Sequence, residues 1–181
     1  FFDPLPSRPR LVIVGAGHVG TKLARLAAEI DLPHVVIDDR PEFADPARFP
    51  KAQRVVCAPL DREPFAQLPI EDQDAIAIVT RRNDLDTACL AAAMATTASY
   101  IGMIGSRKRV ELTYRDLERK GLNPAADPRV HAPIGMKLGD RTPGEVALAI
   151  LAEVVQSRGG APSSAPRRAK EGVQGRGPVV Q

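Results

Sequence analysis

Three glycines, Gly15, Gly17 and Gly20, have the G-x-G-x-x-G spacing that is typical of a turn that binds a pyrophosphate. The first glycine of such a turn permits a tight bend, the second lets the backbone approach the ligand, and the third lets a helix pack closely on a strand. The following helix presents unpaired N–H groups and the positive end of its dipole to an anion. His18 lies inside the turn, where its ring can face the ligand or cap the helix. These four residues therefore predict an anion-binding turn.

Polar residues also follow two other apolar runs of the chain. Asp38 ends one run at about the distance from the glycines where an acidic group accepts hydrogen bonds from ribose hydroxyls. Arg40 offers an alternative, because an arginine nearby can accommodate a 2′-phosphate, although we favour a solvated loop charge. Thr80 follows another run, and ligands bind at the carboxyl ends of strands in open parallel sheets. We therefore predict that Asp38 and Thr80 contact the ligand.

A second stretch that suits an anion consists of Gly105, Ser106 and Arg107, followed by two further basic residues. A hydroxyl and a glycine at the start of a helix, with cationic groups beside them, suit a phosphate. The alternative is that Ser106 caps the helix and the basic residues are solvated. Cations are unfavourable at a helix N-terminus, so their presence favours the anion site. One ligand could bridge this junction and the glycine turn.

The order of apolar runs and helical patterns predicts the fold that positions these residues. Apolar runs without alternation at 11–14 and 75–79 predict strands buried on both faces, and further strands are predicted at 35–37, 54–56 and 99–104. Helical patterns separate most of these runs. We therefore predict an α/β fold with a three-layer, Rossmann-like, doubly wound and mostly parallel sheet over residues 10–156. Residues 1–9 are expected to form an extended lead-in, and residues 157–181 a disordered basic tail.

Three smaller predictions concern single helices. Thr142 and Glu145, with proline between them at the first helical position, predict a capping box that begins the last helix. Asn83 or Asp84 is expected to cap the helix after the fourth strand. A short helix is expected over residues 64–68.

Composition and charge exclude several function classes. The formal net charge is +3, but residues 157–181 hold five basic residues against one acidic residue, so the body of the chain gives no indication of nucleic-acid binding. No run approaches the ~20 apolar residues of a membrane span, and the N-terminal residues lack the order of a signal peptide. We therefore expect a cytoplasmic protein without a membrane partner. Cys57 and Cys89 have no metal-ligand spacing, so both are expected in the core.

The sequence shows no catalytic constellation. None of the three histidines has a paired carboxylate at a recognisable catalytic spacing. His34 is expected to be structural, whereas His131 could reach the same edge of the sheet as the glycine turn.

Four stretches together resemble one family. They are GAGHVG at 15–20, VIDDRPEFA at 36–44, YIGMIGSRKRV at 100–110 and HAPIGMKLGDRTPGEVALAILAEV at 131–154. They resemble the Rossmann domain of the xanthine dehydrogenase accessory proteins, the XdhC/CoxI family. The resemblance implies an accessory protein rather than an enzyme, which binds molybdenum cofactor, protects it during sulfuration and delivers it to apo-xanthine dehydrogenase or a related molybdoenzyme. It leaves room for a sulfurtransferase as a second partner and for a homodimer.

The resemblance also assigns residues, with two departures. Matches to the family motifs occur position by position at Gly15, Gly17, His18, Gly20, Gly105, Ser106 and Arg107. The family's T-R-x-H-x-x-D pattern keeps its aspartate here as Asp86, but Asn83 stands in place of the histidine, so a contact made by that histidine is altered. The N-terminal domain with a cysteine motif, common in the family, is not in this sequence.

Two other function classes stay open on the sequence. A nicotinamide-dependent oxidoreductase would bind NAD(P) and depend on Asp38 and a histidine. A nucleotide-sensing regulatory module, like the domains that gate potassium transport, would share the glycine turn and the terminal acid. The second anion-binding stretch is not expected of that class.

Overall fold

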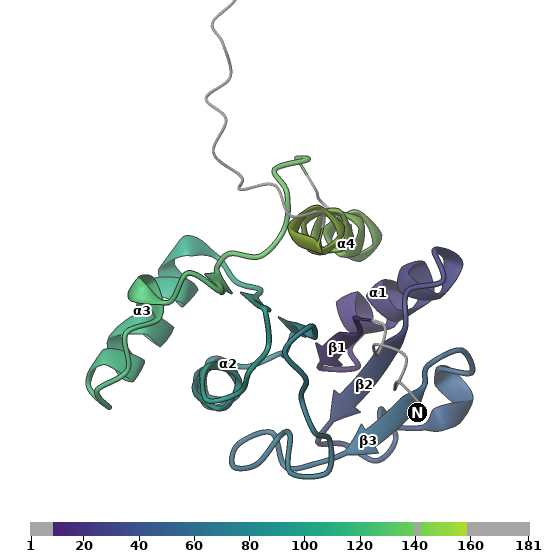
Figure 1. The fold of residues 1–181 in the computed structure, drawn as a ribbon, viewed down its shortest axis with the longest axis horizontal. Coiled ribbons are helices and arrows are strands. Elements are labelled where there is room, and N and C mark those ends of the chain that lie inside the picture. The colour runs from purple at the N-terminus through teal and green to yellow at the C-terminus, as the bar shows by residue number, and fades with distance from the viewer. Residues whose placement is uncertain (1–8, 140–141, 159–181) are drawn as a thin grey trace, which may run out of the picture.

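The computed structural model describes residues 9–139 and 142–158, which form one parallel sheet flanked by helices (Figure 1). The sheet has six strands in the order β3-β2-β1-β4-β5-β6. The strands are β1 (Leu11–Val14), β2 (His34–Asp38), β3 (Arg54–Cys57), β4 (Ala75–Ile78), β5 (Tyr100–Met103) and β6 (Val130–His131). In this Rossmann order the winding reverses between β1 and β4, where such folds bind their ligands. The predicted doubly wound α/β sheet is confirmed.

Two helices cover each face of the sheet (Figure 1). One face carries α1 (His18–Glu29) and α4 (Pro143–Arg158), and the other carries α2 (Asn83–Met94) and α3 (Arg107–Glu118). Side chains of β1 alternate between the two cores, with Leu11 and Ile13 beneath the first pair of helices and Val12 beneath the second. A strand covered on both faces must be apolar throughout, which explains the unbroken apolar runs.

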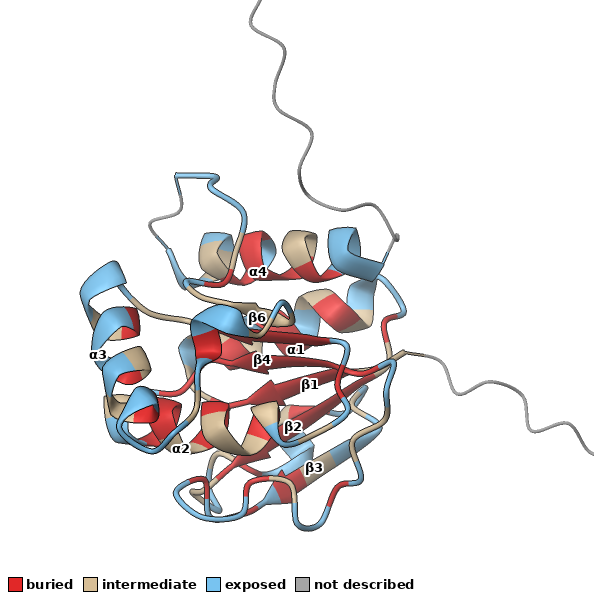
Figure 2. Cartoon of the chain, turned by 60° about the vertical axis from the view of Figure 1, so that its left-hand side comes forward, coloured by how far each residue is buried: buried red, intermediate tan, exposed pale blue. Residues whose placement is uncertain are grey.

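The burial of the strands falls off at both edges of the sheet, in β3 and in β6 (Figure 2). Every residue of β1, β2, β4 and β5 is buried, whereas Arg54 and Cys57 of the edge strand β3 are exposed. The predicted core position of Cys57 is therefore wrong, because an edge strand has one open side. Cys89 of α2 is fully buried, as predicted, and burial raises the pKa of its thiol.

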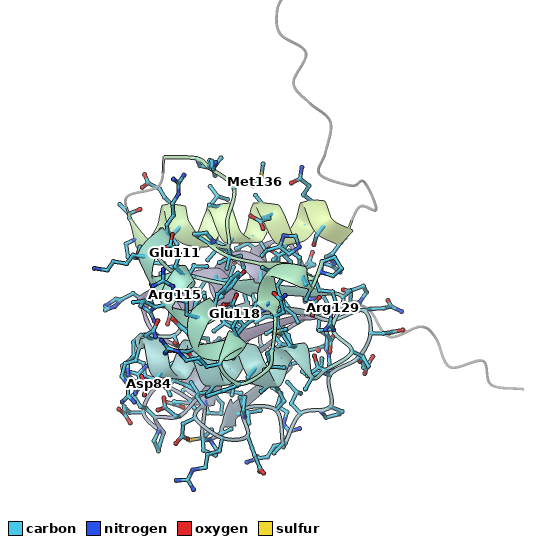
Figure 3. All side chains as sticks on the ribbon, turned by 90° about the vertical axis from the view of Figure 1, so that its left-hand side faces the viewer. Asp84, Glu111, Arg115, Glu118, Arg129 and Met136 are labelled. Atoms are coloured by element: carbon cyan, nitrogen blue, oxygen red, sulfur yellow. The ribbon has the colours of Figure 1, made fainter. Side chains whose placement is uncertain are left out.

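The short strand β6 is a sixth strand, which is not among the five predicted strands. It pairs in parallel with β5, and Arg129 beside it holds the end of α2 in place. The guanidinium donates to the carbonyls of Met94, Thr96 and Ala98 at 3.0, 2.8 and 3.1 Å. Figure 3 shows Arg129 at the end of the molecule away from Asp84, which lies in the first turn of α2.

The helix starts agree with the sequence in part. The capping box is confirmed, because Thr142 N donates to Glu145 Oε2 at 2.8 Å and Glu145 N donates to Thr142 Oγ1 at 3.2 Å. The predicted cap of α2 is wrong, since Arg82 occupies that position without a side-chain hydrogen bond. Asn83 instead accepts a hydrogen bond from Thr113 of α3 at 3.0 Å. The helix predicted over residues 64–68 is a series of turns.

Parts of the predicted domain organisation lie outside the described residues. This applies to the extended lead-in, apart from Pro9, and to the tail beyond Arg158. The helix α4 continues to Arg158, slightly past the expected end of the domain at residue 156. Within residues 9–139 and 142–158, no helix has the length and apolar character needed to cross a bilayer.

We expect Gly20 and Gly17 to differ sharply in tolerance to alanine. A Cβ atom on Gly20 would lie 1.8 Å from the carbonyl oxygen of Gly15, so Gly20→Ala forces α1 away from β1. Overpacking of this kind costs about 1 to 3 kcal/mol of unfolding free energy. A Cβ on Gly17 meets no atom within 4 Å, so Gly17→Ala is the matched control and should lose less than about 1 kcal/mol. Urea denaturation measures both, and equal losses would contradict the packing role of Gly20.

Candidate functional site

The glycine turn between β1 and α1 has the geometry of an open anion-binding turn. Gly15 has a φ of +110°, and its N–H donates to the carbonyl of Ile37 at 2.7 Å. The helix begins at Gly17 with no side-chain cap and no acidic residue in its first turn. Because nothing lies within 4 Å of a Cβ built on Gly17, the backbone there is open to an approaching group. The first N–H groups of α1 are therefore available to a ligand.

A hollow of about 350 Å³ runs along the carboxyl edge of the sheet beside this turn. It reaches from the end of β2 across the start of α1 to the end of β4, and it stops at Ile104 after β5. Five predicted site residues line it: Gly15, Gly17, His18, Asp38 and Thr80. Gly20 does not, because it lies beneath the turn against Gly15.

A second hollow of about 490 Å³ meets the first at Gly17, His18 and Phe43. It extends to the start of α4, where Thr142, Pro143 and Gly144 line it. The sequence pattern pairs the glycine turn with the start of α3 and does not bring the start of α4 to the site. A signal was present in the family-like TPGE stretch, but only the packing of α4 beside α1 shows where that stretch lies.

Asp38 lines the first hollow, but both oxygens of its carboxylate are engaged in hydrogen bonds within the protein. Ala16 N donates to its Oδ2 at 2.7 Å, and Arg40 donates to both oxygens through Nε and Nη2 at 2.9 and 3.0 Å. The backbone N–H of Arg40 adds a fourth hydrogen bond at 3.0 Å. Burial works to raise the pKa of this carboxyl, but the hydrogen bonds from Arg40 and Ala16 outweigh it and lower the pKa.

Arg40 is not the solvated loop charge that we favoured. Its guanidinium lies between the carboxylate of Asp38 and the ring of Phe43, whose centroid is 3.3 Å from the guanidinium carbon. A second ion pair joins the ends of two strands, because Arg81 after β4 donates to both oxygens of Asp39 at 3.0 and 3.2 Å. Arg40 and Arg81 both line the hollow.

The second predicted anion-binding stretch lies just past the end of the hollow. Gly105, Ser106 and Arg107 follow Ile104 directly but are not part of the lining. The hydroxyl of Ser106 accepts the N–H of Arg109 at 3.3 Å, which is the capping role that we considered as the alternative. Arg107 is exposed. Anion binding by these three residues stays a prediction.

A buried carboxylate, missed as a site residue, explains one of the cations at the start of α3. Asp86 of α2 is fully buried; its Oδ1 accepts a hydrogen bond from Thr80 and its Oδ2 accepts one from Arg109 Nε at 2.5 Å. Burial raises the pKa of Asp86 to about 6, although Thr80 and Arg109 favour the charged form. At neutral pH the carboxylate is therefore ionised, and it links β4, α2 and α3.

The remaining histidines lie away from this site. His34 is buried, with its Nδ1 3.0 Å from the carbonyl oxygen of Leu32, so its structural role is confirmed. His131 does not line the hollow at the glycine turn; it stacks on Tyr100 at 4.5 Å and lies 3.7 Å from Glu153, in a separate hollow beside α4. The described ranges contain no group of three histidine, cysteine or acidic residues that could hold a metal ion.

The raised pKa of Asp86 predicts a pH dependence of stability. The folded state holds this proton more tightly than the unfolded state, with a pKa of about 6 against 3.8. The protonated carboxyl of Asp86 therefore stabilises the folded state at low pH, and this stabilisation is lost as the pH rises from about 4 to about 6. We expect the unfolding free energy of the wild type, relative to Asp86→Asn, to fall across this range in urea titrations.

Asp84→Asn is the matched control, because Asp84 is also in the first turn of α2 but is exposed. The hydrogen bond from Arg82 lowers its pKa to about 2, so its contribution is lost only as the pH falls through that value. The difference between wild type and Asp84→Asn should stay flat from about pH 4 to pH 6. A flat difference for Asp86→Asn as well would show that its pKa is not raised.

Comparisons with known proteins agree with this geometry. A family model described as the XdhC Rossmann domain matches residues 11–154. An uncharacterized protein, YqeB, of Escherichia coli (strain K12) is 34% identical over 155 residues, which cover 86% of this chain and 28% of that protein. A probable xanthine dehydrogenase subunit of Bacillus subtilis (strain 168) is 30% identical over 158 residues, which cover 87% of this chain and 46% of that protein. The chain thus spans less than half the length of these curated relatives.

Two solved structures share the architecture. The crystal structure of a xanthine dehydrogenase from Bacillus halodurans has a TM-score of 0.69 at 25% identity, covering 83% of this chain and 44% of that chain. The NAD(P)-binding domain of an exopolyphosphatase-related protein from Archaeoglobus fulgidus has a TM-score of 0.53 at 16% identity, covering 82% of this chain and 99% of that one, and shows the shared fold alone. The family match extends from the first residue of β1 almost to the end of α4, so the chain belongs to the XdhC family through its Rossmann domain.

Proposed function

We propose that this domain binds molybdenum cofactor at the glycine turn and serves as an accessory protein in the maturation of a xanthine dehydrogenase-like molybdoenzyme. Its partner is then the apo form of that enzyme, with a sulfurtransferase as a second partner. Membership of the XdhC family and the similarity to two xanthine dehydrogenase-related proteins support the role. The observation that carries the proposal is the uncapped start of α1, which opens at Gly17 onto a hollow at the switch point of the sheet.

The residues at this hollow suit a phosphorylated, polar cofactor. The free N–H groups at the start of α1 would hold the phosphate of the pterin. Thr80 donates its hydroxyl proton to Asp86, so its oxygen can accept a hydrogen bond from the ligand. The exposed ring of His18 lies where the two hollows meet, within reach of a ligand in either. Bound cofactor would supply the molybdenum centre that the recipient enzyme uses for its chemistry.

The paired hollows support a ligand with a group on each side of its phosphate. Both hollows extend from Gly17 and His18, one toward β2 and β4 and the other toward the start of α4. A dinucleotide form of the cofactor has this shape, and so does NAD(P). An NAD(P)-dependent oxidoreductase and a nucleotide-sensing module are therefore the alternatives, and they differ from the proposal in the ligand that the protein retains.

Retention of the cofactor tests the proposal directly. Purified protein mixed with molybdenum cofactor should carry it through gel filtration, detected by mass spectrometry of the eluted protein. Gly17→Val places a branched side chain in the open space above the turn, so we expect retention to fall about tenfold or more with an unchanged circular dichroism spectrum. Passage of the cofactor free of the wild-type protein, or equal retention by the variant, would contradict the proposal.

The start of α3 is expected to contribute to cofactor binding only through long-range electrostatic attraction. Arg107 is exposed and outside the hollow, so Arg107→Ala should weaken cofactor binding by about twofold to threefold at low salt and less at high salt. Arg119→Ala removes another exposed guanidinium, from the C-cap at the far end of the same helix, and is the control. Binding isotherms at two salt concentrations measure both variants. Identical effects would show that the start of α3 contributes nothing specific.

A further inference from the structure

The carboxylate of Asp38 has no acceptor capacity left for a ligand. A carboxylate that binds a ribose diol must offer free lone pairs to two hydroxyls, and each carboxylate oxygen has two. Oδ1 of Asp38 accepts the N–H and Nε–H of Arg40, and Oδ2 accepts Ala16 N and Arg40 Nη2. Its side chain is 1% exposed. Asp38 therefore occupies the expected position of a ribose acceptor without being able to act as one.

Arg40, in contrast, is held in place and still has donors to offer. Its Nε and Nη2 bind Asp38, and its planar face lies on the ring of Phe43. The Nη1 group forms no hydrogen bond within residues 9–139 and 142–158, and the side chain is 25% exposed where it lines the hollow. A guanidinium fixed on two sides loses little conformational entropy when it binds an anion.

The charges around Arg40 favour an anionic guest. An unpaired carboxylate at the end of β2 would repel a phosphate, but Asp38 is paired with Arg40 and Asp39 with Arg81. The arginines of both pairs belong to the lining of the hollow, and the Nη1 group of Arg40 keeps donors that its ion pair does not use.

We propose that Asp38 anchors Arg40, and that Arg40 makes this end of the hollow a site for a phosphate monoester in place of a free ribose diol. This inference rests on the proposed function only in taking the same hollow as the ligand site. The ligand would then carry two separated anionic groups, one at the start of α1 and one at Arg40.

The pair NADPH and NADH isolates this contact, because the two differ only in a 2′-phosphate. Calorimetric titration of the wild type at one ionic strength should show NADPH binding about tenfold or more tighter than NADH. In Arg40→Gln the two affinities should come within about twofold of each other. Arg81→Gln removes the other guanidinium of the lining and is the comparator, since it should weaken both ligands while keeping the preference. Equal binding by the wild type, tighter binding of NADH, or no binding of either would overturn the inference.

A second variant covers the case in which Arg40→Gln does not fold, because that change leaves a buried carboxylate without its partner. Arg40→Lys keeps a cation opposite Asp38 but loses the planar fork, so the NADPH preference should fall by at least about threefold. An undiminished preference in Arg40→Lys would also overturn the inference. Cofactor retention by the wild type is measured separately, so its success beside equal NADPH and NADH affinities would refute the inference while leaving the proposed function in place.

Discussion

The contact between Gly20 and the carbonyl of Gly15 is the constraint on which the rest of the site depends. A side chain at Gly20 would collide with this oxygen at 1.8 Å, so α1 can start this close to β1 only with glycine there. The close start brings the N-terminal turn of α1 to the edge of the sheet, between the ends of β2 and β4. There the free N–H groups of α1 lie at the hollow. If α1 started farther from β1, its first N–H groups would lie farther from the hollow at the edge of the sheet.

Ion pairs then fix the shape of that edge. Asp38 binds Arg40, Asp39 binds Arg81, and Asp86 binds Arg109, so each carboxylate holds a loop or helix start that would otherwise be free to move. Two of these carboxylates, Asp38 and Asp86, are buried. A buried charge that loses its partner is costly, so removing Arg40 or Arg109 is expected to destabilise the fold. The geometry of the hollow is in this way set by charge as much as by apolar packing.

The sequence predicted the sheet well because a buried strand is recognisable locally, as a short run of apolar residues. Unbroken apolar runs located the five longer strands, and the TPGE stretch located the start of α4. The errors share a physical cause, which is that the deciding partner is distant in sequence. The exposure of Cys57 depends on β3 being the edge strand, and the pairing of Asn83 depends on Thr113 of α3. That Asp38 has all its acceptor sites occupied depends on the side-chain conformation of Arg40, which the spacing of residues in the sequence does not predict.

The start of α4 adds a second hollow beside the glycine turn. Because α4 packs beside α1 on one face, its capped start comes next to Gly17 and His18 and forms the second hollow. The capping box pairs the N–H groups of Thr142 and Glu145 within the helix start itself, in contrast to the uncapped start of α1. In the proposed binding mode, the start of α1 would take the phosphate, while the start of α4 lines the space beyond it. A ligand that used only the first hollow would leave this part of the family-like sequence without a role at the site.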